Sequence, residues 1–320
     1  MSATRYTTIE LCAGGGGQAL GLERAGFEHL ACVEYEPDFC KTLQFNRPHW
    51  NVLCRDVREL DAAELGTCDL LAGGVPCPPF SIAGKQLGEA DERDMFPAVL
   101  NLIKEMRPRG VLLENVKGLL SKKFAEYRDA IAGRLSALGY EVQYRLLEAS
   151  DYGVPQLRPR FILVALNAAD MAHFTWPEPH ETRVTVGDAL RDLLGANGWR
   201  GADALCEKAQ AVAPTLVGGS KKHGGPDLGP TRARMQWRGL GIDGLGIANA
   251  EPAADFPDDG MPRLTLRMAA RIQGFPDSWN FYGNKTTSYR QIGNAFPPPV
   301  AQAVGGQIID AFRRSDRAER

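Results

Sequence analysis

The first half of the chain alternates short apolar runs with segments whose apolar residues recur every three or four positions. The apolar runs predict strands, at Tyr6–Leu11, His29–Glu34, Val52–Arg55, Leu70–Gly73, Gly110–Leu113, Glu141–Glu148 and Arg160–Leu166. The periodic segments predict helices, from Gln18 to Ala25, from Pro37 onward, at Phe96–Met106, at Phe124–Leu138 and at Pro299–Arg313. Strands that alternate with helices predict an α/β fold, with a mostly parallel sheet and helices on both faces.

The pattern changes near Ala168. From Thr175 to about Pro262 the chain is rich in glycine and proline and shows little sustained periodicity, and a regular pattern resumes at Arg263. A long segment of this kind predicts a second, smaller domain or a functional insertion.

Composition narrows the class of protein. The 320 residues suffice for one large domain or two unequal ones, and 44% of them are hydrophobic and 24% charged. No apolar run approaches the roughly 20 residues of a membrane span, and no signal-peptide pattern opens the chain, so we expect a cytoplasmic protein without membrane association. The seven cysteines form no C-x-x-C pair and the five histidines are scattered, so we expect no metal site. The net charge of −2 does not indicate nucleic-acid binding, although a local basic patch would suffice for it.

A glycine-rich loop follows the first predicted strand. The run Cys12-Ala13-Gly14-Gly15-Gly16-Gly17 opens a helix, whose first N–H groups are unpaired and can face a ligand. Glu34 ends the second strand, where its carboxylate could accept hydrogen bonds from both ribose hydroxyls of an adenosine, and Asp56 follows the third, where it could take the adenine amino group. The loop predicts a nucleotide-like cofactor but also fits the dinucleotide template, so NAD stays open at this point.

A candidate nucleophile follows the strand at Leu70–Gly73. Cys77 stands between Pro76 and Pro78, and the prolines restrict the loop that carries the thiol. The carboxyl ends of strands are where ligands bind in open α/β sheets, and a thiolate suits addition to an electron-poor ring carbon. A buried structural cysteine in a proline-rich turn is the alternative.

Several motifs, in the same order, resemble those of the cytosine-C5 DNA methyltransferases. They are the glycine loop, Pro76-Cys77, Asp91-Glu92-Arg93-Asp94-Met95-Phe96, Glu114-Asn115-Val116, Gln156-Leu157-Arg158-Pro159-Arg160, Arg263 through Pro276, and Gly293-Asn294-Ala295. The resemblance covers most of the chain outside about Ala168–Pro262. Three positions depart from the family pattern: Cys12 where phenylalanine is usual, Pro78 where glutamine often follows the cysteine, and Met268 where an acidic residue is common.

The resemblance implies a reaction. A methyl group would pass from S-adenosylmethionine to C5 of a flipped cytosine in duplex DNA, leaving S-adenosylhomocysteine. Cys77 would attack C6 to form a covalent adduct, and Glu114 would stabilise the charge that develops on the ring at N3. Arg160 would hold the cytosine O2, and Arg158 would support the Cys77–Glu114 geometry.

The resemblance also implies the domains and the cofactor pocket. A Rossmann-like, S-adenosylmethionine-dependent methyltransferase domain would comprise residues 1–167 and 288–320, and a smaller target-recognition domain would be inserted at residues 168–287. The pocket would use Cys12, Ala13, Gly14, Gly15, Gly17, Glu34, Tyr35, Asp56, Val57, Pro76, Met95, Asn294 and Ala295.

The candidate DNA contacts lie mostly in the inserted segment. Thr215-Leu216-Val217 resembles a short landmark of the recognition domain. A basic cluster follows, in a stretch with few acidic residues, and it consists of Lys221, Lys222, Arg232, Arg234 and Arg238. Lysines would contact phosphates and one or two arginines would contact guanine edges. Ser81 would contact a phosphate of the flipped nucleotide. A solvated basic loop is the alternative.

Three other functions compete with DNA methylation. A transfer-RNA cytosine methyltransferase would usually carry Cys-Phe-Thr, which the sequence lacks. A catalytically silent DNA-binding regulator would not need Cys77, Glu114, Arg158 and Arg160 together. An NAD-dependent oxidoreductase would leave the Pro-Cys and Gln-x-Arg-x-Arg runs unexplained. The family resemblance further suggests a cognate restriction endonuclease that acts on the same DNA site.

Overall fold

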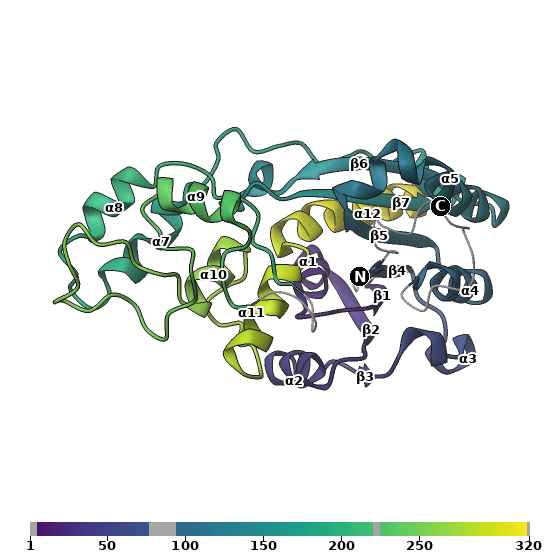
Figure 1. The fold of residues 1–320 in the computed structure, drawn as a ribbon. Coiled ribbons are helices and arrows are strands. Elements are labelled where there is room, and N and C mark those ends of the chain that lie inside the picture. Colours follow the sequence, from purple (N-terminus) through teal and green to yellow (C-terminus); the bar gives the residue numbers. More distant parts are fainter. Residues whose placement is uncertain (1–4, 77–93, 220–224, 319–320) are drawn as a thin grey trace. The chain divides into compact units, whose positions relative to one another are not determined.

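The computed structural model describes residues 5–76, 94–219 and 225–318. The chain divides into two compact units (Figure 1). The first comprises Met1–Leu147, Pro159–Glu178 and Val300–Arg320, and the second comprises Glu148–Arg158 and Pro179–Pro299. No helix in the described ranges is long and apolar enough to cross a membrane.

A seven-stranded sheet is the centre of the first unit's described part, in the order β3-β2-β1-β4-β5-β7-β6. The strands are β1 Tyr6–Leu11, β2 Phe27–Glu34, β3 Val52–Cys54, β4 Leu70–Gly74, β5 Gly110–Val116, β6 Glu141–Glu148 and β7 Pro159–Leu166. β1 pairs in parallel with both β2 and β4, β2 with β3, and β4 with β5, whereas β5 and β7 are antiparallel. The prediction of a mostly parallel sheet is therefore confirmed.

The strand order reverses between β1 and β4. The chain leaves β1 toward β2 and β3 and returns to β4 on the other side of β1. Ligands of open α/β sheets bind at such a switch point, beyond the carboxyl ends of the strands. The loops that follow β1 and β4, which carry the two strongest motifs of the sequence, therefore start at neighbouring strands.

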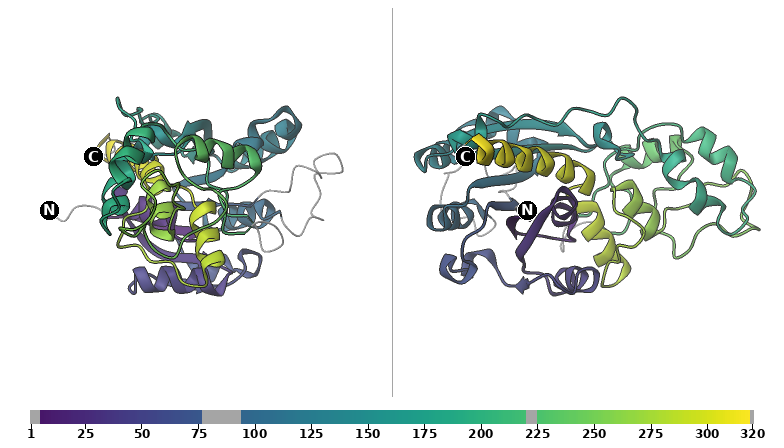
Figure 2. Two further views of the ribbon diagram at one scale, coloured as in Figure 1. Left: turned by 60° about the vertical axis from the view of Figure 1, so that its left-hand side comes forward. Right: turned by 180° about the vertical axis from the view of Figure 1, so that it is seen from behind.

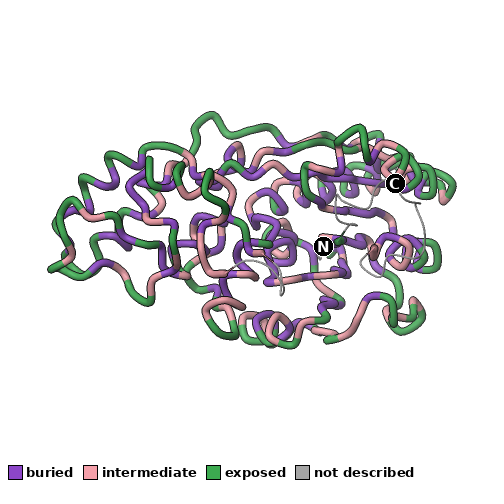
Figure 3. Tube along the Cα trace, in the orientation of Figure 1, coloured by how far each residue is buried: buried purple, intermediate pink, exposed green. Residues whose placement is uncertain are grey.

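Helices cover both faces of this sheet, as predicted (Figure 2). On one face, apolar side chains of α4 (Phe96–Met106) and α5 (Ala125–Ala137) share a buried core with strand residues such as Leu71 and Val111. On the other face, α1 (Gly17–Ala25) packs against α12 (Pro298–Ala318). Their close approach requires a glycine, because a Cβ at Gly305 would lie 2.8 Å from Leu22 Cδ2. The central strands are buried while the outer sides of the helices are exposed (Figure 3).

The remaining helices of the first unit are short or peripheral. They are α2 Pro37–Asn46, α3 Ala62–Leu65 and α6 Ala168–Met171. α2 begins at the proline that the sequence indicated, since proline has no N–H to leave unpaired in a first turn. α1 ends at Gly26, whose positive φ of 111° lets its N–H reach the carbonyls of Leu22 and Glu23.

The second unit is helical in its described part. Its helices are α7 Val186–Gly195, α8 Ala202–Lys208, α9 Thr231–Gly239, α10 Leu266–Ile272 and α11 Lys285–Asn294. The sequence did not predict α7, α8 or α9, although α7 carries a local start signal. Thr185 accepts a hydrogen bond from the Asp188 N–H, and Asp188 reciprocates at the Thr185 N–H, which is a capping box.

Candidate active site

The glycine loop after β1 has the backbone conformation that close ligand approach requires. Cys12, Gly14 and Gly16 have positive φ angles of 54°, 57° and 85°. The Ala13 N–H donates to the Val33 carbonyl over 2.9 Å, which ties the loop to the end of β2. A Cβ placed on Gly14 would meet no protein atom within 4 Å, so open space lies beside this backbone.

Glu34, at the end of β2, is fixed beside this loop. Its carboxylate accepts the N–H of Gly14 over 2.7 Å, and the N–H groups of Tyr35 and Glu36 over 2.8 Å each. Burial raises the pKa of Glu34 above its ordinary value, and these hydrogen bonds oppose that rise in part. A carboxylate has about four acceptor sites, so three bonds leave about one of them, which can still accept a ribose hydroxyl.

The other predicted adenosine contacts of the first unit differ in exposure. Tyr35 is 57% exposed, and Val57 is buried. Arg58 binds the Asp56 carboxylate through Nη2 at 2.6 Å and Nε at 3.0 Å and lowers its pKa. Although the charge of Arg58 balances that of the Asp56 carboxylate, the carboxylate can still accept a hydrogen bond from an amino group. Burial raises the pKa of the nearby Cys12 thiol to about 12, which keeps it protonated.

The end of β4 leads to the predicted nucleophile. Any larger residue in place of Gly73 would force the neighbouring backbone to shift, because a Cβ there would lie 2.8 Å from the Leu11 carbonyl oxygen of β1. Gly74 pairs with Glu114 in the β4–β5 register. The Asn115 side-chain amide then donates to the Val75 carbonyl over 2.8 Å, and both groups are buried. β5 therefore holds the chain two residues before Cys77.

Glu114 and Arg160 form the charged pair of this site. Arg160 Nε lies 2.7 Å from Glu114 Oε1, and the side chains are only 11% and 12% exposed. The sheet explains their meeting: Glu114 stands opposite Ile162 in the antiparallel β5–β7 pair, and Arg160 is two residues along β7 on the same face. A guanidinium and a carboxylate so placed can hold a planar polar ring by its edge.

Arg158 lies in the second unit and is almost fully buried, at 1% exposed. Its guanidinium donates to the carbonyls of Leu216 over 2.8 Å and of Gly293 over 2.7 Å. It therefore connects the Thr-Leu segment with the Gly-Asn-Ala motif. The family resemblance implied that Arg158 supports the arrangement of Cys77 and Glu114, and that role stays a prediction.

Two further predicted cofactor residues also belong to the second unit. The Asn294 amide donates to the Gly219 carbonyl over 3.0 Å, and the Ala295 carbonyl accepts the Gln273 amide over 2.5 Å. Thr215, a predicted DNA contact, donates its hydroxyl proton to the Leu157 carbonyl over 2.5 Å. These bonds fix the backbone of both motifs.

The remaining predicted site residues are distributed as follows. Pro76 is exposed, and Met95 is partly buried beside α4. Arg232, Arg234 and Arg238 lie on α9. Four residues fall outside the described ranges, namely Cys77, Ser81, Lys221 and Lys222.

The sequence analysis did not predict the role of Asn115, which binds a main-chain group. Asn115 was noted only as part of the Glu-Asn-Val motif, with no role of its own. Its partner, the Val75 carbonyl, is a main-chain group, which leaves no signal in the sequence. The motif alone could have indicated that Asn115 mattered.

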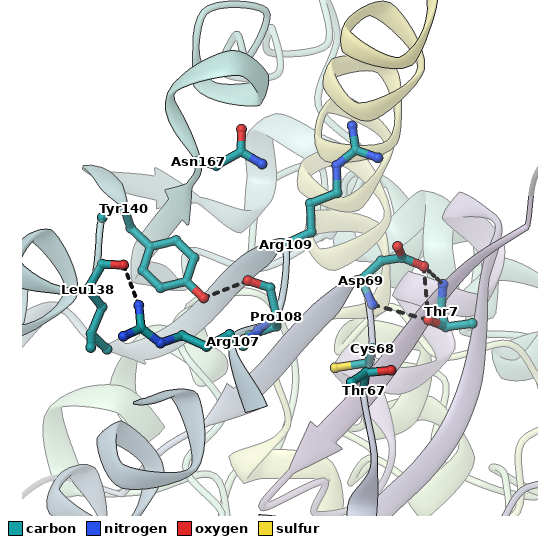
Figure 4. Close-up of a pocket in the computed structure, with 11 residues that line it drawn as sticks. Thr7, Thr67, Cys68, Asp69, Arg107, Pro108, Arg109, Leu138, Tyr140 and Asn167 are labelled. Atoms are coloured by element: carbon teal, nitrogen blue, oxygen red, sulfur yellow. Dashed lines mark hydrogen bonds between the residues drawn. The ribbon is translucent and has the colours of Figure 1, made fainter. Parts of the chain in front are cut away.

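A cavity of about 530 Å³ lies elsewhere in the first unit. It is at the opposite edge of the sheet, where Thr7 lies in the first half of β1, Asp69 precedes β4 and Pro108 lies just before β5 (Figure 4). Several of its polar groups already have partners: Asp69 accepts the N–H and hydroxyl of Thr7, and the Tyr140 hydroxyl donates to the Pro108 carbonyl. The cavity therefore offers few groups to a ligand and is separate from Glu114.

Comparison with known proteins identifies the family. The C-5 cytosine-specific DNA methylase family matches residues 6–310. The Type II methyltransferase M.NaeI of Lentzea aerocolonigenes is 53% identical over 308 residues, covering 95% of this chain and 75% of that protein. The Type II methyltransferase M.NgoMIV of Neisseria gonorrhoeae is 52% identical over 316 residues, covering 98% and 100%. Among solved structures, the methyltransferase EhMeth of Entamoeba histolytica has a similar fold, with a TM-score of 0.69 at 15% identity over 97% of this chain and 99% of that one.

Proposed function

Since the chain belongs to the C-5 cytosine-specific DNA methylase family, we propose that it transfers a methyl group from S-adenosylmethionine to C5 of a cytosine flipped out of duplex DNA. The target cytosine would lie within a specific DNA sequence. The product of the donor would be S-adenosylhomocysteine.

The observation that carries the proposal is the Glu114–Arg160 pair next to the anchored Val75. Glu114 and Asn115 are consecutive residues of β5: the first meets Arg160 at 2.7 Å, and the second holds the Val75 carbonyl at 2.8 Å. The same strand end thus supports both the groups that would bind cytosine and the segment that leads to Cys77. An oxidoreductase would have no use for this combination.

The glycine loop fits S-adenosylmethionine. The open space beside Gly14 admits a ligand against the backbone, and Glu34 keeps acceptor capacity for a ribose hydroxyl. Tyr35, which is 57% exposed, would pack on the adenine face, and Asp56 would take its amino group. Asn294 and Ala295 would complete the pocket. When bound, S-adenosylmethionine supplies an electrophilic methyl group.

The chain's own residues would make cytosine reactive. The Cys77 thiolate would form a bond to C6, and the electron pair of the C5–C6 double bond would then be available at C5. Glu114 would hydrogen-bond the ring at N3 and stabilise the charge that develops there, while Arg160 would hold O2. After methylation, loss of the C5 proton to a base would expel the thiolate and restore the ring.

Residues 168–287 would form the target-recognition domain. A stacked base is out of reach of a pocketed thiol, so the duplex must be bound and the base extruded. Arg158 would act as a positioning residue, because it holds the carbonyls of Leu216 and Gly293 rather than presenting its charge to solvent. Ser81, Lys221 and Lys222 would contact phosphates, and Thr215 would lie at the DNA-facing segment.

The relatives suggest a biological setting. Both are Type II methyltransferases, so we place this chain in a restriction-modification system with a cognate endonuclease that acts on the same site. The substrate would be cytoplasmic DNA, and no stable complex with the endonuclease is required.

A covalent trap tests this mechanism. Duplex DNA with 5-fluorocytosine at the target position cannot lose fluorine as a cation, so the adduct persists after methyl transfer. Incubation with S-adenosylmethionine should yield a protein–DNA band that survives denaturing electrophoresis, and Cys77→Ser should abolish it. Methylation of ordinary DNA without any trapped band would contradict the Cys77 adduct.

A further inference from the structure

Helix α9 has an unusual composition for a surface helix. Its nine residues, Thr231–Gly239, include three arginines and no acidic residue. A helix of this charge attracts an anionic partner. It also carries an exposed apolar side chain, Met235, which is 68% exposed.

The helix presents two different sides. Trp237 is fully buried, and Arg234 is half-buried with its stem against Gly244, where a Cβ would lie 3.0 Å from Arg234 Cγ. At 100° per residue, Met235 and Arg232 lie on the side opposite Trp237, and Gln236 and Arg238 lie at the two edges of this exposed face. All four are exposed.

The helix is fixed from behind. The carbonyl of the buried Trp237 accepts the N–H groups of Leu240 and Ile242, each over 3.0 Å. The turn that follows needs a glycine, since Gly241 has a φ of 82° and a Cβ there would lie 2.2 Å from Leu205 Cδ1. A helix held this way offers its exposed side chains from a rigid support, which recognition favours.

The acidic groups near α9 are already engaged. Asp227 accepts the Gly229 N–H over 2.8 Å within its own turn. Asp243 binds Arg263 over 2.7 Å and accepts the Leu245 N–H, and its influence on Arg238 is electrostatic only. In the described part of the chain, Arg232 and Arg238 form no ion pair, so their charges are available to a partner.

We propose that the exposed face of α9 contacts base edges in the target DNA, with Met235 and Gln236 as specificity-determining residues, Arg232 between them around the helix and Arg238 on the other side of Met235. This rests on the proposed function. The major groove admits an α-helix, in which an amide can bind adenine bidentately, an arginine can bind guanine, and an apolar side chain can contact the thymine methyl group. Arg234, which the sequence analysis placed in the same basic cluster as Arg232 and Arg238, would instead stabilise the folded structure.

The test uses a duplex library randomised around the methylated cytosine, treated with the full-length protein and sequenced for 5-methylcytosine. The variants are Met235→Ala, Gln236→Ala, Arg232→Ala and Arg238→Ala. Two controls lie in the second unit outside α9: Arg200→Ala, whose side chain is 79% exposed, and Met261→Ala, which is 38% exposed. Thermal unfolding and S-adenosylmethionine affinity confirm that each variant is folded.

Met235→Ala and Gln236→Ala should relax the preference at one or two positions about tenfold or more. Arg232→Ala and Arg238→Ala should raise the KM for DNA and each reduce the slope of log affinity against log salt by about one. The controls should match the wild type. An unchanged sequence profile and salt slope in all four variants would overturn the role of α9 while leaving DNA methylation intact. Wild-type protein that methylates no DNA would overturn the proposed function itself.

Discussion

The side-chain amide of Asn115 donates a hydrogen bond to the main-chain carbonyl of Val75 over 2.8 Å, in a buried setting. The bond joins the carboxyl ends of β5 and β4 beyond their last paired residues, Glu114 and Gly74. It restrains the chain immediately before Pro76 and Cys77. Positioning of the nucleophile therefore depends on a side chain that need not touch substrate.

Asn115→Ala should impair both stability and turnover. A buried carbonyl left without its donor costs about 1–3 kcal/mol in the free energy of unfolding, which urea denaturation measures. The methylation rate should fall at least about tenfold, with S-adenosylmethionine affinity unchanged, because the Cys77 segment loses its restraint. Asn46→Ala is the matched control, since Asn46 makes a similar bond to the Thr42 carbonyl in α2. Equal rates for Asn115→Ala and wild type would contradict a positioning role.

Glu114→Gln should reduce kcat by about 10²–10⁴-fold, the range for loss of a positioned acid or base. Arg160→Lys keeps the charge but loses the planar fork, so it should be slower than wild type and faster than Arg160→Ala. Rapid-quench measurement of a single turnover separates these effects from DNA binding. A Glu114→Gln protein within threefold of the wild-type rate would remove Glu114 from the chemistry.

Gly14→Ala tests whether the loop after β1 binds the cofactor. Its Cβ would meet no protein atom, but φ is +57°, so the substitution should cost about 1–2 kcal/mol of stability. Gly139→Ala is matched, with φ of +91° and no atom within 4 Å, and lies between α5 and β6. Both should lose similar stability, while only Gly14→Ala should lose S-adenosylmethionine affinity, by about tenfold or more in calorimetric titration. Equal affinities in the two variants would place the cofactor elsewhere.

The affinity for S-adenosylmethionine should depend on pH through Glu34. Burial raises the pKa of this carboxyl, so it becomes protonated at a higher pH than an ordinary glutamate. The ionised form is the acceptor for ribose hydroxyls, so affinity should be full above that raised pKa and fall as the pH falls through it. For folding alone the sign is opposite, because the cost of burying the ionised group appears as the pH rises through the same range.

Titrations at several pH values compare wild type with Glu34→Gln, which cannot ionise. The variant should bind more weakly at neutral pH and lose the pH dependence that Glu34 causes. A wild-type affinity that stays constant down to the ordinary glutamate range would show that the carboxylate is not the ribose acceptor.

The main elements of the sheet could be predicted because their signals are local. β1 and α4 match their predicted bounds, Tyr6–Leu11 and Phe96–Met106, since an apolar run and a helical period each reveal themselves within a few residues. The antiparallel direction of β7 could not be predicted, because it depends on which neighbour the strand meets. Helices α7 to α9 were missed because glycine and proline interrupt their surroundings and each is short.

The candidate site, like the sheet, could be predicted only where the signal is local in the sequence. Glu34 was predicted from its place at the end of a strand, and Glu114 and Arg160 from motifs; the structure adds their partners. The bonds of Arg158 to Leu216 and Gly293 could not be predicted, since they join segments 58 and 135 residues away through main-chain carbonyls. Tertiary contacts to backbone atoms leave no pattern in a single sequence.

The most direct test of the central claim is methyl transfer itself. The protein is incubated with radiolabelled S-adenosylmethionine and either mixed-sequence duplex DNA or bulk transfer RNA, alongside a Cys77→Ser control. We expect label in DNA as 5-methylcytosine, none in transfer RNA and none with the control. Label in transfer RNA alone, or no transfer to either while the cofactor still binds, would contradict the account.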